Sequence, residues 1–230
     1  MTTAADHLLV DLARETAAEV ARLARERELA RVNERDHLQA SCTRAARTVV
    51  SSLRTDLIVS TSLGFKSPLW PRLGRVDLAL VSGEETPIAV ELKSGAGRDA
   101  LAACAWDAVK LAFMLRHQQV SAAYLLAATP ASDWAVGLRG TEFFAASSFE
   151  TQALREPYLD WWRSWERDGY PAGRQLPATF ETRPVARVSF QVGTTEWVVA
   201  VAAVETESSE GLEWQPKLSD GFDLGPATSG

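Results

Sequence analysis

The sequence predicts an α/β fold built on a mixed sheet, and three observations predict it. Apolar residues recur at helical spacing over residues 4–31 and again from residue 36, whereas between residues 57 and 93 they alternate or form short runs. A further helical pattern at 98–117 then leads into a continuous apolar run at 122–128. The composition, 46% hydrophobic and 23% charged over 230 residues, is that of an ordinary globular chain. The expected core order is α-β-β-β-α-β.

Apolar stripes predict the two N-terminal helices. The first covers residues 4–31, where Leu9, Leu12 and Val20 recur among Arg and Glu, so residues 1–32 form an N-terminal helix ahead of the core. The second helix begins near Asp36. Its stripe consists of Leu38, Cys42, Ala45, Ala46, Val49 and Leu53.

Three strands, a helix and a fourth strand complete the expected core, which spans residues 33–130. The strand candidates are residues 57–60, 75–81 and 87–93, with a hairpin loop between the last two. The helix at 98–117 follows Gly95 and Gly97. The run at 122–128 ends at a Thr-Pro pair, and its unbroken apolar character is typical of a strand buried on both faces.

Residues 131–204 are expected to form a C-terminal extension packed on the core. A Trp-rich helix is predicted over 150–168, and a β-hairpin joins strands at 185–192 and 197–204. Its tryptophans could stack on bases, but Leu154, Tyr158, Trp161 and Trp165 share one helical stripe, which favours packing in the core. Residues 205–230 are acidic and rich in Ser, Gly and Pro, as is typical of a solvated, partly disordered tail.

The charge distribution bears on the partners that the protein can bind. The net charge of −6 argues against nucleic acid, but residues 205–230 carry six acidic side chains against one lysine, so the rest of the chain is close to neutral. No apolar stretch is long enough to cross a membrane, and the N-terminus lacks the features of a secretory signal. The two isolated cysteines form neither a disulfide framework nor a zinc motif. We therefore expect a cytoplasmic protein with no membrane partner.

The most informative stretch lies at residues 74–93. A hairpin centred on Glu84 would place Asp77 directly opposite Glu91, with Lys93 on the same face of the sheet. Two carboxylates facing each other repel, so a positive group should lie between them. Hard oxygen ligands at this spacing suit Mg²⁺ or Mn²⁺, although Lys93 alone could also neutralise the pair.

These residues resemble the PD-(D/E)XK phosphodiesterase superfamily of restriction-endonuclease-like nucleases. The resemblance is carried by Asp77, by the run Glu91-Leu92-Lys93, and by the α-β-β-β-α-β order, and it covers residues 33–130. Val76 stands where the family's name has proline, and no separate target-recognition domain is visible. The resemblance implies a restriction-endonuclease-like core, here extended by a C-terminal helix and a β-hairpin.

The resemblance also implies roles for individual residues. Asp77 and Glu91 would hold the metal, with the backbone carbonyl of Leu92 as a further ligand. Lys93 would orient or deprotonate the attacking water and stabilise the charge that develops. Glu34, just ahead of the second helix, is the candidate for one more ligand, although an acidic residue there is also favoured by the helix dipole alone.

A second group of residues would contact the substrate. Lys110 on the helix after the site would touch the scissile phosphate, or else is a solvated lysine. The expected activity is metal-dependent hydrolysis of phosphodiester bonds, with DNA as the first candidate substrate. The alternative is a non-cleaving protein of the same fold that acts as a binding or structural module, as a homodimer or in a larger assembly. Basic residues that could position a phosphate backbone are Lys66, Arg72, Arg75 and Arg98.

Overall fold

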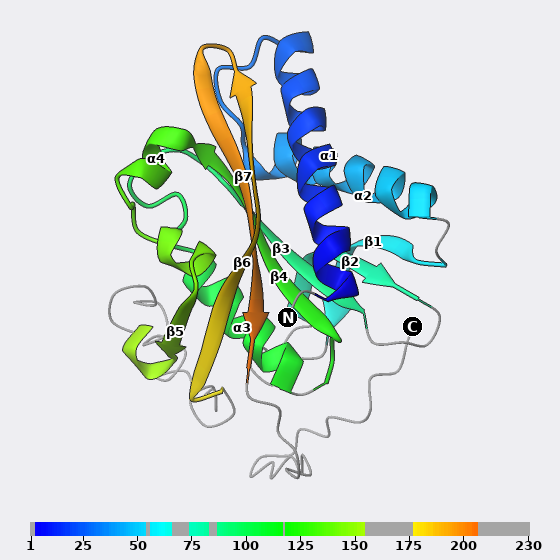
Figure 1. The fold of residues 1–230 in the computed structure, drawn as a ribbon, viewed down its shortest axis with the longest axis vertical. Coiled ribbons are helices and arrows are strands. Elements are labelled where there is room, and N and C mark those ends of the chain that lie inside the picture. The colour runs from blue at the N-terminus through cyan, green and yellow to red at the C-terminus, as the bar shows by residue number, and fades with distance from the viewer. Residues whose placement is uncertain are drawn as a thin grey trace.

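The centre of the protein is a seven-stranded mixed sheet in the order β1-β2-β3-β4-β7-β6-β5 (Figure 1). All neighbouring strands are antiparallel except β3 and β4, which are parallel and are joined through a helix. The predicted α/β class with a mixed sheet is confirmed. The structure, a computed structural model, describes residues 3–53, 56–65, 74–82, 87–116, 118–154 and 177–206. The strands are β1 Ile58–Phe65, β2 Gly74–Val81, β3 Ile88–Ser94, β4 Ala122–Pro130, β5 Ser147–Glu150, β6 Thr179–Val192 and β7 Thr195–Glu205.

Helices cover both faces of this sheet. Helices α1 and α2 pack on one face, where their apolar stripes meet Leu78, Val90 and Leu126. Helix α3 packs on the other face, against Ala79, Ala89 and other small side chains. The helices are α1 Ala4–Glu26, the π-helix η1 Glu34–Gln39, α2 Ala40–Leu53, α3 Cys104–Arg116, α4 Ala131–Ala135 and the 3₁₀ turns η2 Thr141–Phe144 and η3 Gln152–Leu154.

Strand β4 lies in the middle of the sheet. It pairs with β3 on one side and with β7 on the other, and every residue after Ala122 in it is buried. Its side chains alternate between the two apolar layers, with Leu125 on the α3 side and Leu126 on the α1 side. This arrangement confirms the strand buried on both faces that the unbroken apolar run predicts.

The predicted C-terminal hairpin is confirmed, and it belongs to the same sheet as the core. Strands β6 and β7 turn at Gly193 and Thr194, and β7 then pairs along its length with β4. The register of the hairpin shifts between Pro184 and Ala186. Proline has no N–H to donate to a neighbouring strand, which is the physical reason for an irregularity at this point.

Several boundaries differ from those that the sequence predicts. The second helix begins at Glu34 with a π-turn, in which the Leu38 N–H donates to the Asn33 carbonyl at 3.0 Å, rather than near Asp36. Helix α3 begins at Cys104, because tight i→i+3 turns occupy residues 97–103. Helix α4, η2 and β5 are not foreseen by the periodicity. The predicted Trp-rich helix and acidic tail fall largely outside the described residues.

None of the helices in the described ranges combines the length with the apolar character that crossing a membrane requires.

A buried carboxylate ties α1 to the sheet. Asp6 is only 1% exposed and accepts hydrogen bonds from the Thr3 N–H at 2.8 Å and from the Tyr124 hydroxyl on β4 at 3.1 Å. Arg183 on β6 donates to both of its oxygens, at 3.0 and 3.1 Å. Burial acts to raise the pKa of Asp6, but these donors together hold it below its ordinary value. The network therefore favours the ionised form and fixes α1 across two strands.

Asp6→Asn is expected to lower the free energy of unfolding by on the order of 2 kcal/mol at neutral pH, because a buried charged acceptor of several hydrogen bonds is lost. Since its folded pKa lies below the unfolded one, the stabilisation exists above about pH 3.9 and disappears as the pH falls through the folded pKa. Urea unfolding between pH 2 and 7 measures both effects. Asp11→Asn, at a half-exposed carboxylate of the same helix, is the matched control and should change stability by less than about 0.5 kcal/mol.

Candidate active site

The β2–β3 hairpin has the register that the sequence predicts. Leu78 pairs with Val90 and Leu80 pairs with Ile88. Continued by one residue, this register sets Asp77 opposite Glu91, and Glu91 forms an ion pair with Lys110 on α3.

The two strands stop pairing just before these carboxylates. The last paired residues are Leu78 and Val90, and one step further the Leu92 N–H donates to Asp77 Oδ2 at 2.9 Å. The carboxylate of Asp77 therefore takes the place that a backbone carbonyl would occupy in a continued ladder. Asp77 is partly exposed where the strands part, whereas Glu91 is 3% exposed.

Lys93 lies against three oxygen atoms. Its Nζ is 2.8 Å from Asp107 Oδ2 on α3 and 3.6 Å from Glu34 Oε2 on η1. It also donates to the backbone carbonyl of Leu92 at 3.1 Å. Lys93 on β3 thus links this strand to both α3 and η1.

Lys110 has an equivalent set of contacts. Its Nζ forms an ion pair with Glu91 Oε1 and donates to the Arg75 carbonyl at 3.1 Å. Asp107 Oδ1 lies 3.5 Å away. Each of the two ammonium groups therefore faces two carboxylates and one carbonyl, and Asp107 bridges them with one oxygen for each lysine.

Local sequence explains how these side chains reach one point. Asp107 and Lys110 are three residues apart, so they share one face of α3. That helix approaches the sheet closely because Ala105, Ala108 and Ala112 are small and fully buried. On the other side, the π-turn begins at Glu34, and Ser94 at the end of β3 donates to the Val32 carbonyl at 3.2 Å.

The charges of the cluster shift one another's pKa values. Burial, supported by the nearby Asp107 carboxylate, raises the pKa of Glu91 well above its usual range, in spite of the ion pair with Lys110. Burial likewise raises the pKa of Glu34. For both lysines burial acts in the opposite direction, but the surrounding carboxylates outweigh it and raise the pKa above the ordinary value. Both lysines are therefore positively charged at neutral pH.

The structure brings together the predicted site residues in one cluster. These are Asp77, Glu91, Lys93, Lys110, Glu34 and the backbone of Leu92. Lys110, for which the sequence leaves a solvated position open, is instead 8% exposed and ion-paired. Of the basic residues considered for substrate contact, Arg75 and Arg98 are exposed, while Lys66 and Arg72 fall outside the described residues.

Asp107 is the member that sequence reasoning did not assign to the site. It is 5% exposed and contacts both lysines. The available signal was its position three residues before Lys110, because a carboxylate and a lysine at that spacing share one helix face. The decisive information, that this face meets Lys93, depends on how α3 packs against the sheet.

The donor set agrees in charge and atom type with a hard divalent cation. Four carboxylates against two ammonium groups leave two negative charges in excess when all are ionised, and the donors are oxygen atoms. In the described ranges, no three His, Cys, Asp or Glu side chains stand in a ready-made metal-binding arrangement. Lys93 and Lys110 already contact several of the oxygen atoms that such an ion would need as ligands.

Comparison of the chain with protein-family models, with curated proteins and with solved structures finds no match in any of the three. Function is therefore inferred from the geometry of this cluster.

Glu91→Gln is expected to stabilise the metal-free protein at neutral pH by on the order of 1 kcal/mol, since it removes a buried charge whose ionised form is disfavoured. The folded pKa of Glu91 is raised, so its contribution is favourable below the unfolded pKa and is lost as the pH rises through the folded pKa. The stability gained by Glu91→Gln over the wild type should accordingly shrink as the pH falls towards about 4.3, the unfolded pKa of a glutamate. Chemical denaturation in EDTA from pH 4 to 8 measures it.

Glu196→Gln is the matched control, because Glu196 is exposed and lies on β7 near the hairpin turn. A Glu91→Gln variant that is less stable than the wild type at pH 7 would show that the ion pair with Lys110 outweighs the cost of burial.

Proposed function

We propose that this chain hydrolyses phosphodiester bonds in nucleic acid, with DNA as the first candidate substrate and Mg²⁺ or Mn²⁺ as cofactor. The observation that carries the proposal is the meeting of Asp77, Glu91 and Lys93 where β2 and β3 part, in the predicted register. The element order α2-β1-β2-β3-α3-β4 supports a restriction-endonuclease-like core over residues 33–130.

The residues that would hold the cation, and Lys93, each have a role in this proposal. Asp77, Glu91, the Leu92 carbonyl and Glu34 would hold the cation, which supplies a Lewis acid that makes water more acidic and offsets charge on phosphoryl oxygens. The ammonium of Lys93 is kept charged by Asp107 and Glu34, so it suits the stabilisation of developing negative charge better than the removal of a proton.

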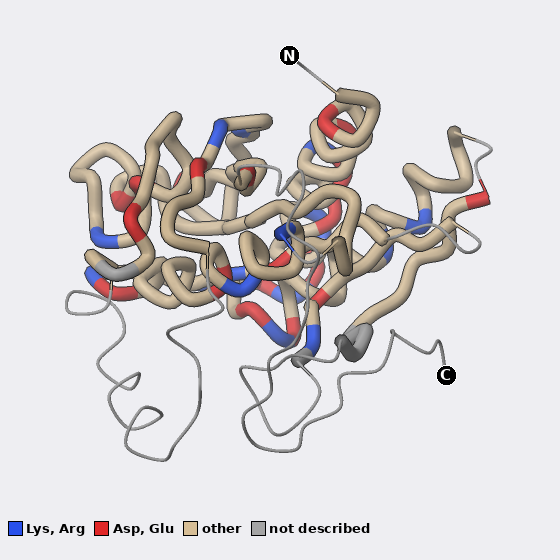
Figure 2. Tube along the Cα trace, turned by 90° about the horizontal axis from the view of Figure 1, so that it is seen from below, with Lys and Arg blue, Asp and Glu red and all other residues tan. Residues whose placement is uncertain are grey.

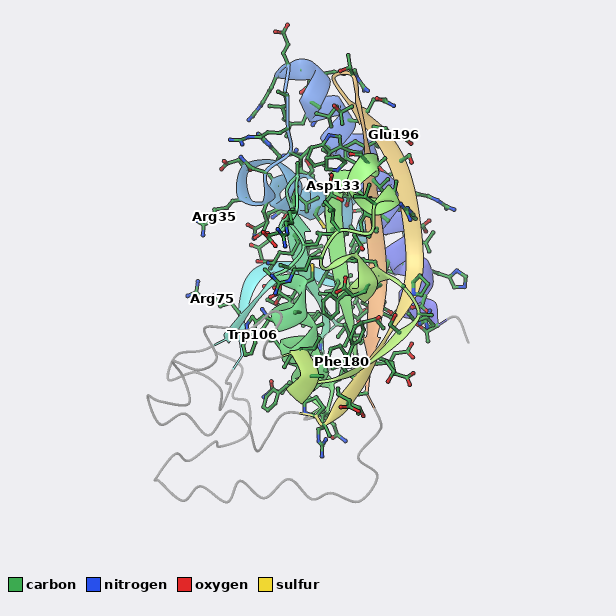
Figure 3. All side chains as sticks on the ribbon, turned by 90° about the vertical axis from the view of Figure 1, so that its left-hand side faces the viewer. Arg35, Arg75, Trp106, Asp133, Phe180 and Glu196 are labelled. Carbon is green, nitrogen blue, oxygen red and sulfur yellow. The ribbon has the colours of Figure 1, made fainter. Side chains whose placement is uncertain are left out.

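The surroundings of the cluster support a polyanionic substrate. Acidic and basic residues are intermixed along the described chain rather than sorted onto opposite sides (Figure 2). Arg35 follows Glu34 in the sequence, and the backbone carbonyl of Arg75 binds Lys110, so each arginine belongs to a segment that contributes to the cluster. Both arginine side chains extend outward on the same side of the molecule (Figure 3). Exposed arginines in these positions could bind the phosphates of a nucleic acid.

A binding or structural role is the second candidate, and one observation favours it. The two lysines neutralise Glu91 and Asp107 within the chain itself, so the cluster persists without a ligand. A module that only binds nucleic acid needs the arginines and not the carboxylates.

Cleavage of a mixture of single-stranded and double-stranded DNA and RNA, in EDTA and with Mg²⁺ or Mn²⁺, tests the enzymatic proposal. We expect cleavage that depends on the divalent ion and that falls by roughly a hundredfold or more in Asp77→Asn, because a charged ligand is lost. Asp11→Asn makes the same chemical change on α1, which packs on the opposite face of the sheet, and should cleave like the wild type. Nucleic-acid binding without cleavage under any of these conditions would instead support the binding module.

Arg35→Gln and Arg75→Gln should each weaken binding of the nucleic acid in Ca²⁺ and lower the slope of log affinity against log salt by about 1. Fluorescence anisotropy over a range of salt concentrations measures both quantities. Arg14→Gln removes an exposed arginine from α1 and should leave the slope unchanged. Equal effects of all three variants would indicate non-specific attraction rather than a defined phosphate path.

A further inference from the structure

Lysine ammonium groups contact three of the four groups that the proposed function assigns to a divalent cation. Lys110 is paired with Glu91, and Lys93 contacts both Glu34 and the Leu92 carbonyl. The fourth group, Asp77, accepts the Leu92 N–H. A cation that uses these oxygens must therefore replace contacts that the chain makes with itself.

Lys110 is the lysine whose release frees the motif carboxylate on β3. Its ion pair with Glu91 is buried, with side-chain exposures of 10% and 3%. Glu91 Oε1 thus has the Lys110 ammonium as its charge partner, in a place from which water is largely excluded. A divalent cation bound at Glu91 would compete with this ammonium for the same carboxylate.

A second carboxylate is already beside the Lys110 ammonium. Asp107 Oδ1 lies 3.5 Å away, and the Arg75 carbonyl accepts a hydrogen bond from the same nitrogen at 3.1 Å. A lysine side chain is flexible, so its Nζ can turn from Glu91 to Asp107 while it remains bound to Arg75. Asp107 can then serve both lysines, one with each oxygen.

We propose that Lys110 is an internal counter-ion of Glu91 that gives this carboxylate up to a divalent cation and moves its ammonium to Asp107. Both residues are then positioning residues of the site. The inference rests on the metal site of the proposed function, but not on the substrate or on cleavage.

A purely structural salt bridge would have the opposite consequence. If Lys110 only holds Glu91 in place, its replacement disorders the site and weakens the binding of a divalent ion. If Lys110 competes with the ion, its replacement removes a positive charge from the immediate neighbourhood and strengthens binding. The sign of the change in affinity therefore separates the two roles.

The experiment is calorimetric titration of the full chain, freed of metal with EDTA and dialysed, with Mn²⁺ alone. Lys110→Gln should bind Mn²⁺ at least about tenfold more tightly than the wild type. Asp107→Asn should bind it more weakly, because the displaced ammonium has no second carboxylate. In the double variant, which combines Lys110→Gln with Asp107→Asn, the loss of Mn²⁺ affinity caused by Asp107→Asn should largely disappear. No ammonium then remains that would need Asp107 as its second partner.

Two controls keep the result interpretable. Lys110→Arg retains the positive charge and should not gain affinity, and Arg14→Gln removes a charge from the opposite face of the sheet and should match the wild type. If Lys110→Gln unfolds in EDTA, Mn²⁺ should refold it at a lower concentration than saturates the wild type, as followed by circular dichroism. Failure to refold would overturn the proposal.

The outcomes separate this inference from the proposed activity. Tighter Mn²⁺ binding by Lys110→Gln in a chain that cleaves nothing supports the counter-ion role and removes the nuclease. If Lys110→Gln binds Mn²⁺ as tightly as the wild type or more weakly, the counter-ion role is overturned and the nuclease proposal stands. No Mn²⁺ binding by the wild type or by Lys110→Gln overturns both.

Discussion

The Asp107 carboxylate lies between the ammonium groups of Lys93 and Lys110, in a place from which water is largely excluded. Charge at such depth is costly unless opposite charge lies beside it, so the elements that carry these groups have to meet there. Helix α3 supplies Asp107 and Lys110, and strand β3 supplies Lys93. The π-turn supplies Glu34, which contacts Lys93. Strands β2 and β3 separate here and leave room for the charged side chains. The Asp77 carboxylate accepts the Leu92 N–H, which would otherwise bond to a backbone carbonyl of β2.

Two buried carboxylates in this chain illustrate different uses of burial. Asp6 accepts hydrogen bonds from Thr3, Tyr124 and Arg183, and its pKa lies below the ordinary value. Glu91 is nearly as buried, and burial together with the neighbouring Asp107 carboxylate raises its pKa. A fully satisfied carboxylate stabilises the fold, whereas a frustrated one is typical of a site that binds or reacts.

The apolar layers explain why the frustrated site is tolerated. Strand β4 is buried on both faces and joins β3 to β7, so the sheet continues unbroken from the hairpin beside the cluster to the C-terminal hairpin. Helices pack on both sides of it, and the Asp6 network fastens α1 across β4 and β6. Stability from these layers offsets the cost of the buried charges in the cluster.

Period and spacing in the sequence determined the three long helices, most of the strands, the central strand among them, and the hairpin register, because these depend on residues close together in the chain. That register alone sets Asp77 opposite Glu91. Only the tertiary structure decided that Asp107 belongs to the site, that Lys93 binds it rather than Glu91, and that Lys110 is buried. Each of these depends on the height and rotation at which α3 and the π-turn pack against the sheet. Packing of this kind is set by the volumes of many side chains distant in sequence, which no local pattern encodes.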